Sequence, residues 1–348
     1  MKILFFTVSD QTIASSRIRV FQYLPYLARE SIACKVVVYT PSALLGKNSF
    51  VLMLHHIFKI FLFLILSFFY PVVFIQKIIL PRFFMSTLNF FGKKIVFDFD
   101  DAVYTIHQSA AKHPGEKSRE RLFYNFIHMI RCSNLVILVT DQTKKLVELH
   151  NSNMLHITGP VDIERYRPRS KEINKVQLVV GWIGSPQNTL YLEPLIPVLK
   201  RLGAKYTNVC FTFIGSALKD IPYLDCRFVK WDLHTEISEL EKFDIGIMPL
   251  PDDEWARAKG GYKLLQYMAL GIPSVAAPVG INTSLLEDGE NGFLAASEQE
   301  WFDRLSFLIE NKQERLRMGA KAREMAVSVY STDVAFPRLH GAIEALFK

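Results

Sequence analysis

Residues 258–294 read AKGGYKLLQYMALGIPSVAAPVGINTSLLEDGENGFL. A glycine pair precedes 263–270, an apolar stretch with helical periodicity, and Gly271 follows where a helix commonly ends. The short apolar run 273–277 is typical of a buried strand, and a second glycine-bearing turn comes after it. This order of turn, helix, strand and turn predicts one repeat of a parallel α/β sheet.

The same alternation continues along the rest of the chain. The predicted strands are the opening run after Lys2, 34–39, 72–76, 94–97, 135–139, 176–181, 209–214, 227–229, 245–248 and 273–277. The predicted helices are 16–29, 51–70, one N-capped by Asp141, 189–202, 237–242, 263–270, 298–310, 313–329 and 334–347. A charged segment that contains Pro168 and ends near Lys175 suits a linker. We therefore predict two doubly wound domains, 1–165 and 175–330, and a C-terminal helix at 331–348 that packs back on the first domain.

The composition excludes several classes of protein. The chain has 348 residues, of which 50% are hydrophobic and 22% charged, so it is not disordered. Its 41 basic and 34 acidic residues give a net charge of +7, which indicates an anionic partner. The basic residues are scattered without an aromatic–basic platform, so nucleic acid is disfavoured. The four cysteines form no CxxC pair, which argues against a zinc site or a disulfide framework and favours a reducing compartment.

One stretch is more apolar than a soluble domain requires. Residues 60–76 carry no formal charge, and we divide them at Pro71 into a helix near 51–70 and the strand 72–76. This helix has three possible interpretations: a buried core helix, a helix that lies at a membrane interface, or a transmembrane span. Pro71 argues against a span, and the opening strand meets Asp10 too soon for an export signal. We predict a monotopic helix at 51–70 that attaches the protein to the cytoplasmic face of a membrane.

Two glycine-bearing turns predict an anion site. The backbone N–H groups and the dipole at a helix start after Gly260 and Gly261 favour a diphosphate, to which Lys259 and Lys263 can add charge. The turn at 280–283 has the same character. Ordinary turn chemistry with solvated lysines remains the alternative for each feature taken singly.

Several motifs together resemble a known family. They are KLLQYMALGIP at 263–273, DGENGFL at 288–294, GWIGSP at 181–186, Met318-Gly319 with Arg323, Tyr330-Ser331, DFDDAVY at 98–104 and SSRIR at 15–19. The chain thus resembles retaining glycosyltransferases of family 4, in the bacterial branch that makes polysaccharides and lipid-linked glycans. The resemblance implies the GT-B fold, in which two Rossmann-like domains face a central cleft. It also implies sugar transfer from a nucleotide diphosphate sugar to a hydroxyl of a membrane-associated acceptor, without a metal or other cofactor.

The resemblance assigns roles to particular residues. Donor contacts are implied for Gly184, Ser185, Lys259, Gly260, Gly261, Gln266, Gly280, Asn282 and Thr283. Catalytic roles are implied for Asp101, His107 and Lys263, and acceptor contacts for Arg17, Arg19, Asp98 and Asp100. Alternatives stay open for these residues. The three aspartates could hold a metal ion, or their carboxylates could only cap backbone N–H groups at the end of a strand. His107 could be a histidine of a surface loop, and the two arginines could belong to a solvated face.

The chain also departs from the family pattern. The family often has glutamates where Ala258 and Gln266 stand, and the usual Arg and Lys are missing from 181–188. Gln266 can still hydrogen-bond a donor hydroxyl. The missing carboxylates keep one rival function open, an inactive GT-B binding subunit. The enzyme rival is a nucleotide-sugar epimerase or hydrolase on the same fold, which would not need the apolar helix at 51–70.

Overall fold

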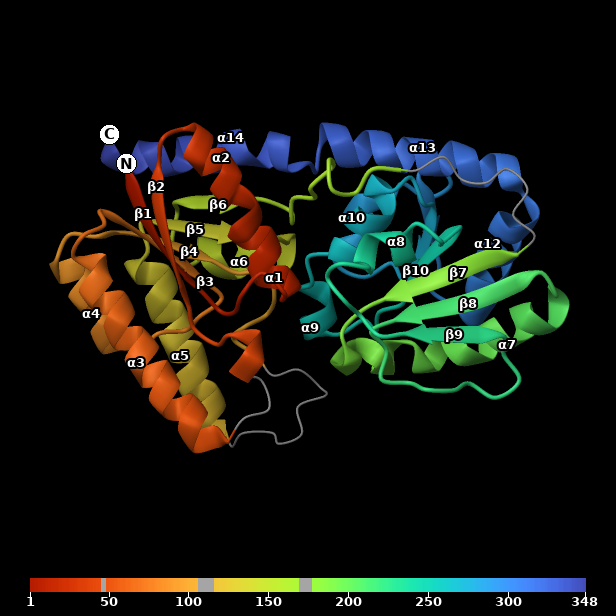
Figure 1. Cartoon of the computed structure of the whole chain (residues 1–348), viewed down its shortest axis with the longest axis horizontal. Coiled ribbons are helices and arrows are strands. Elements are labelled where there is room, and N and C mark those ends of the chain that lie inside the picture. Colours follow the sequence, from red (N-terminus) through yellow and green to blue (C-terminus); the bar gives the residue numbers. More distant parts are fainter. Residues whose placement is uncertain (45–47, 106–115, 169–176) are drawn as a thin grey trace. The chain divides into compact units, whose positions relative to one another are not determined.

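The computed structural model describes residues 1–44, 48–105, 116–168 and 177–348. The chain divides into two compact units. The first comprises 1–160, 258–260 and 332–348, and the second comprises 161–257 and 261–331. Each unit contains one six-stranded parallel sheet, as expected from the repeated βα pattern (Figure 1).

The sheet of the first unit has the order β2-β1-β3-β4-β5-β6. Its strands are β1 (Lys2–Thr7), β2 (Ala33–Val38), β3 (Val72–Gln76), β4 (Lys94–Asp98), β5 (Leu135–Leu138) and β6 (Met154–His156). The central strands are apolar at most positions and buried along nearly their whole length, because helices cover both faces. In β1, for example, Ile3 and Phe5 pack into the core on one face, and Phe6 on the other face stacks on Phe63 at 4.4 Å between ring centroids.

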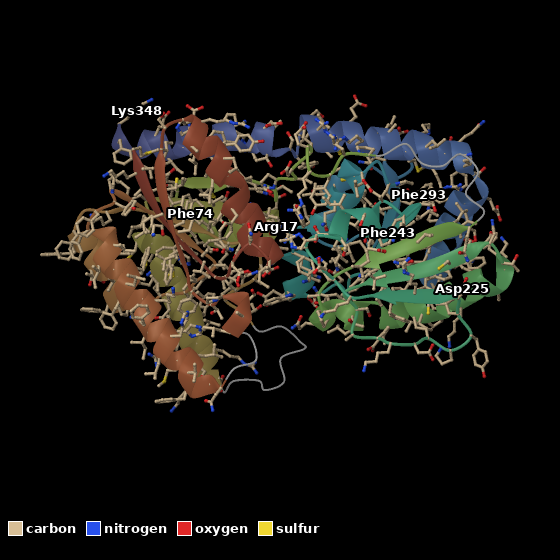
Figure 2. The ribbon with its side chains drawn as sticks, viewed as in Figure 1. Arg17, Phe74, Asp225, Phe243, Phe293 and Lys348 are labelled. Atoms are coloured by element: carbon tan, nitrogen blue, oxygen red, sulfur yellow. The ribbon has the colours of Figure 1, made fainter. Side chains whose placement is uncertain are left out.

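Two groups of helices cover this sheet. One face carries α1 (Ala14–Arg19), α2 (Leu24–Arg29) and α14 (Thr332–Glu344). The other carries α3 (Ser49–Ser67), α4 (Arg82–Phe90) and α5 (Glu116–Cys132), and α6 (Asp141–Glu148) joins β5 to β6. Phe336, Leu339 and Ile343 of α14 are buried in the same core cluster as Phe74, which lies inside the unit (Figure 2). The last helix of the chain is therefore part of the first unit.

The sheet of the second unit has the order β12-β11-β10-β7-β8-β9. Its strands are β7 (Leu178–Ile183), β8 (Val209–Ile214), β9 (Cys226–Val229), β10 (Ile245–Met248), β11 (Ser274–Ala276) and β12 (Gly292–Leu294). Its helices are α7 (Ile196–Lys205), α8 (Glu236–Leu240), α9 (Glu254–Arg257), α10 (Tyr262–Ala269), α11 (Asn282–Leu285), α12 (Glu298–Glu310) and α13 (Lys312–Ser328). The helix α10 precedes β11, so the stretch 258–294 forms the repeat that its pattern predicts.

Local backbone chemistry changes two predicted elements. The predicted helix 16–29 is interrupted by a 3-10 turn at Phe21–Tyr23, and α2 restarts with Pro25 in its first turn, where proline is tolerated. The predicted N-cap Asp141 is wrong. Thr140 caps α6, because its side chain accepts from a backbone N–H of the first turn, and Asp141 is the first helical residue.

The division between the units falls earlier than predicted. It lies between Pro160 and Val161 rather than at 165, and residues 258–260 group with the first unit rather than the second. The expected linker contributes to the second unit, since Tyr166 is only 1% exposed. Residues 169–176 lie outside the described part of the chain.

Candidate functional site

The start of α10 brings Gly261 close to the second predicted turn, at 280–283, within the second unit. Gly261 precedes the helix with a φ of +65°, in the left-handed region. A Cβ there would lie 2.6 Å from Leu285 Cδ1 and 2.7 Å from Ile281 Cγ2. Only glycine therefore allows this backbone conformation and this close approach of α10 to the segment around α11.

The turn before α11 contributes a buried amide. Gly280 has a φ of +56°, and Asn282 is fully buried. Asn282 Nδ2 donates to the Ala277 carbonyl at 3.0 Å, whereas Asn282 Oδ1 meets no hydrogen-bond donor among the described residues. The exposed Thr283 donates to the Gly280 carbonyl at 2.9 Å. Asn282 is therefore enclosed within the turn, and the predicted donor contacts of Gly280, Asn282 and Thr283 stay predictions.

Lys263, in the first turn of α10, lies along an indole ring. Its Nζ is 4.5 Å from the centroid of the buried Trp182, at a distance that gives a cation–π interaction. Its Cε is 3.1 Å from the position that a Cβ on Gly184 would occupy. The adjacent Ser185 is exposed and accepts from Asn188 Nδ2 at 3.0 Å. The structure therefore groups Gly184 and Lys263 beside the helix start, and Trp182 is a support that the sequence reasoning missed.

Gln266 lies in α10, as predicted, with its side chain buried. It is 4% exposed, and its Nε2 donates to Tyr166 Oη at 2.9 Å. Tyr166 in turn donates to the buried Glu236, which also accepts from Trp231 Nε1 at 2.6 Å. The amide nitrogen of Gln266 is thus used inside the second unit, and a contact between its amide oxygen and a donor hydroxyl stays a prediction.

Two other predicted donor residues belong to the first unit. Lys259 and Gly260 lie in the segment 258–260, and a Cβ on Gly260 would approach Val139 Cγ1 to 2.9 Å. Their contact with a donor stays a prediction.

Arg19 and Asp98 form an internal ion pair in the first unit. Their side chains are 1% and 2% exposed. Arg19 Nε donates to Asp98 Oδ1 at 2.9 Å, Nη2 donates to Oδ2 at 2.5 Å, and Nη1 donates to the Ile157 carbonyl at 2.9 Å. Burial alone would lower the pKa of Arg19, but the charge of Asp98 raises it above its ordinary value. The prediction that these two residues contact an acceptor is therefore wrong, because their polar atoms are buried and satisfy one another.

Asp100 and Asp101 are bound by a lysine that the sequence reasoning missed. Lys77 follows β3 with a φ of +61°, its Nζ is 3.1 Å from Asp100 Oδ1, and it also contacts Asp101. Burial alone would raise the pKa of Asp100, but Lys77 and a hydrogen bond from Ser15 lower it. Burial alone would lower the pKa of Lys77, and the two carboxylates raise it. Both aspartates keep about a fifth to a quarter of their side chains exposed, 20% and 24%, so their roles in acceptor binding and catalysis remain predictions.

The other predicted residues of the first unit have different outcomes. Arg17 is 7% exposed, and its Nη1 donates to the Gln11 carbonyl at 3.1 Å and to the Thr12 carbonyl at 3.4 Å, which holds the loop after β1. Its acceptor contact stays a prediction. His107 lies outside the described residues. Within the described ranges, no group of three or more His, Cys, Asp and Glu residues is arranged to hold a metal ion.

Comparisons with known proteins agree with this architecture. Residues 175–311 match the family described as Glycosyl transferases group 1. No curated protein sequence matches the chain. The fold is similar to that of Anabaena HepE in complex with UDP, with a TM-score of 0.70, 16% identity, and coverage of 99% of this chain and 100% of that one.

Two further solved structures have the same fold. Sucrose-phosphate synthase from Thermosynechococcus elongatus has a TM-score of 0.72 and 11% identity, and the alignment covers 99% of each chain. A glycosyltransferase from Rickettsia africae has a TM-score of 0.70 and 11% identity, with 99% of this chain and 98% of that one covered. The chain has the GT-B fold of two Rossmann-like domains, and the match over residues 175–311 supports a glycosyltransferase of group 1.

Proposed function

We propose that the protein is a retaining glycosyltransferase of family 4. It transfers a sugar from a nucleotide diphosphate sugar to a hydroxyl of a lipid-linked or polysaccharide acceptor. The reaction belongs to polysaccharide synthesis at the cytoplasmic face of a membrane, and it needs no metal or other cofactor.

The start of α10 carries this proposal. The N-terminal end of a helix of eight residues combines backbone N–H groups with the positive end of the helix dipole. Lys263 adds a full positive charge, held between Trp182 and the bare backbone of Gly184. When the bond between the sugar and the diphosphate breaks, negative charge grows on the diphosphate. Fixed positive groups aimed at that charge lower the barrier without reorganising.

The nucleotide itself is proposed to be UDP. Anabaena HepE, which has the same fold, has been solved with UDP and with UDP-glucose.

In the first unit, Asp100 and Asp101 suit the acceptor. Asp100 is ionised at neutral pH because Lys77 and Ser15 lower its pKa. An ionised carboxylate accepts the hydrogen bond of an incoming hydroxyl and favours its partial deprotonation. Lys77 neutralises one of the two negative charges and fixes both carboxylates in place.

Donor binding is tested first. UDP-, GDP- and ADP-sugars are added to the purified protein, and a sugar nucleotide that binds raises its melting temperature by mass action. The variant Lys263→Met is compared with Lys312→Met, which changes an exposed lysine at the start of α13. We expect the UDP-sugar shift to survive in Lys312→Met and to be reduced or lost in Lys263→Met.

Turnover is tested second, as release of UDP with and without a bacterial lipid extract as acceptor. We expect release that depends on the extract, and a loss of roughly 10²–10³-fold in Lys263→Met. Release or epimerisation without acceptor indicates a hydrolase or epimerase. Binding without any turnover indicates an inactive binding subunit.

A further inference from the structure

An apolar surface covers the outer side of α3 and α4. We call it the α3–α4 surface. Its members are large apolar side chains that are 45–84% exposed: Phe50, Val51, Met53, Leu54, Ile57, Phe58, Phe61, Ile65, Phe68, Phe69, Phe83, Phe90 and Phe91. More than half of the exposed large apolar side chains in the described part of the chain lie here. Monomeric soluble proteins rarely expose a continuous apolar area of this kind without a partner for it.

Aromatic contacts join the two helices into one surface. Phe61 of α3 meets Phe84 of α4 edge-on at 6.1 Å between ring centroids. Phe68, at the end of α3, meets Phe91 at 4.7 Å in the same manner. Side chains stand out from the outer side of these helices in Figure 2. The sequence predicted the apolar character of α3, but the contribution of α4 follows only from the structure.

The helix α3 lies along the sheet of its own unit. Among the described residues it is the one helix that is long and apolar enough to cross a bilayer, by length and composition alone. However, Phe63 and Ser67 are buried on its inner side, and Phe63 stacks on Phe6 of β1. A span would have to withdraw Phe63 from this core and carry Lys59, near the middle of the helix, through the bilayer. The geometry fits a helix that lies flat, with one side on the protein and the other side on its partner.

The charge of this region identifies the partner. Between Glu30 and Asp98 the sequence contains no acidic residue. Three basic residues lie on or directly after the two helices: Lys59, Arg82 and Lys93. Two copies of such a surface would repel one another, whereas an anionic lipid surface attracts each basic residue.

We propose that the α3–α4 surface docks on an anionic lipid bilayer, with α3 and α4 parallel to the membrane plane. The phenylalanines enter the boundary between headgroups and acyl chains, and Lys59 and Arg82 contact the anionic headgroups. This interaction goes beyond sugar transfer, because it needs no donor and no acceptor.

Co-sedimentation of the full chain with vesicles tests the proposal. One set of vesicles is pure phosphatidylcholine, and the other contains roughly 30 mol% of the anionic lipid phosphatidylglycerol. We expect binding to the anionic vesicles, weaker binding to the neutral ones, and a decrease in binding as salt is raised. The triple variant Phe58→Gln/Phe61→Gln/Ile65→Gln should lower the bound fraction at least ~10-fold, because it removes three exposed apolar side chains.

Two further variants make the result specific. Leu149→Gln/Leu316→Gln removes exposed apolar side chains elsewhere, at 75% and 58% exposure, and should leave vesicle binding unchanged. Lys59→Gln/Arg82→Gln should reduce the preference for anionic vesicles. The thermal shift with UDP-sugar should be the same in all these variants. Co-sedimentation therefore reports membrane docking, and the thermal shift reports donor binding independently of it.

Two outcomes overturn the proposal. The first is a wild-type protein that stays in solution with anionic vesicles. The second is a stable dimer that the triple Gln variant converts to monomer without any change in vesicle binding, which would assign the surface to a second copy of the chain.

Discussion

Replacing Arg19 by Met distinguishes an internal ion pair from an acceptor ligand. The substitution keeps the length of the side chain but strands the carboxylate of Asp98, whose side chain is 2% exposed. Breaking a buried ion pair by removing one partner costs about 3–5 kcal/mol. The Ile157 carbonyl also loses its donor, which adds about 1 kcal/mol. We therefore expect the free energy of unfolding of the first unit to fall by roughly 4–6 kcal/mol.

The chain has a natural probe that separates the two units. All four tryptophans, Trp182, Trp231, Trp255 and Trp301, lie in the second unit. In urea unfolding, far-ultraviolet circular dichroism reports both units, and tryptophan fluorescence reports the second. Arg19→Met should lower the midpoint of a dichroism transition and leave the midpoint of the fluorescence transition nearly unchanged, because the ion pair and Ile157 belong to the first unit.

The double variant Arg19→Met/Asp98→Leu provides the control. Without the stranded carboxylate, only about 1–2 kcal/mol should be lost, from the Ile157 carbonyl and imperfect packing. The reasoning is refuted if Arg19→Met unfolds like the wild type while sugar transfer is abolished, since the arginine would then act on an acceptor.

Three further predictions concern the glycine turn, the lysine–aspartate cluster and metal. Gly261→Ala should lower the free energy of unfolding by about 2–4 kcal/mol, through the positive φ and the overlap with Leu285, and should weaken the UDP thermal shift. Gly289→Ala is the control, because Gly289 has a φ of +81° but open space around it, and it should cost only about 1–2 kcal/mol. Equal costs for the two variants would contradict the packing argument. Lys77→Gln should lower the free energy of unfolding by an amount that is constant from about pH 5 to 10 and becomes smaller outside that range. The lowered pKa of Asp100 stabilises the fold in full only above the ordinary value of about 3.9, and the raised pKa of Lys77 does so only below its ordinary value of about 10.4. A stability difference that stays the same down to about pH 2 would disprove this pairing. Sugar transfer should survive EDTA, since Lys77 already contacts both Asp100 and Asp101 and neutralises one of their two negative charges. A loss of transfer that Mn²⁺ or Mg²⁺ restores would instead make these aspartates metal ligands.

Much of the fold could be predicted because its local signals agree with its packing. The runs 72–76, 209–214 and 245–248 are apolar almost throughout, and they form buried strands with those same bounds. The helix 298–310 begins at a capping box, a signal confined to its first residues. The break within 16–29 was less visible, although Pro25 marks the restart of a helix.

The candidate site could be predicted where neighbouring residues in the sequence define it, as for Gly261 and Lys263 at the start of α10. Gly261 was recognisable because a glycine before a helix has few other reasons to be there. The burial of Gln266 depends on Tyr166, which lies 100 residues away, and that of Arg19 depends on Asp98, 79 residues away. Lys77 precedes its aspartate partners by more than twenty residues and meets them only because β3 and β4 are neighbours in the sheet. Pairings of this kind follow from topology, which a single sequence does not display.

The position of α14 has a consequence for synthesis on the ribosome. The residues of the second unit, 161–257 and 261–331, all precede this helix, so that unit has left the ribosome before the core of the first unit can be completed. Until Phe336, Leu339 and Ile343 emerge, the apolar face of the first sheet around Phe5 and Phe74 lacks part of its cover. The unit that begins the chain is therefore the last to reach its native state, and in the meantime it is the part of the nascent protein that most needs a chaperone.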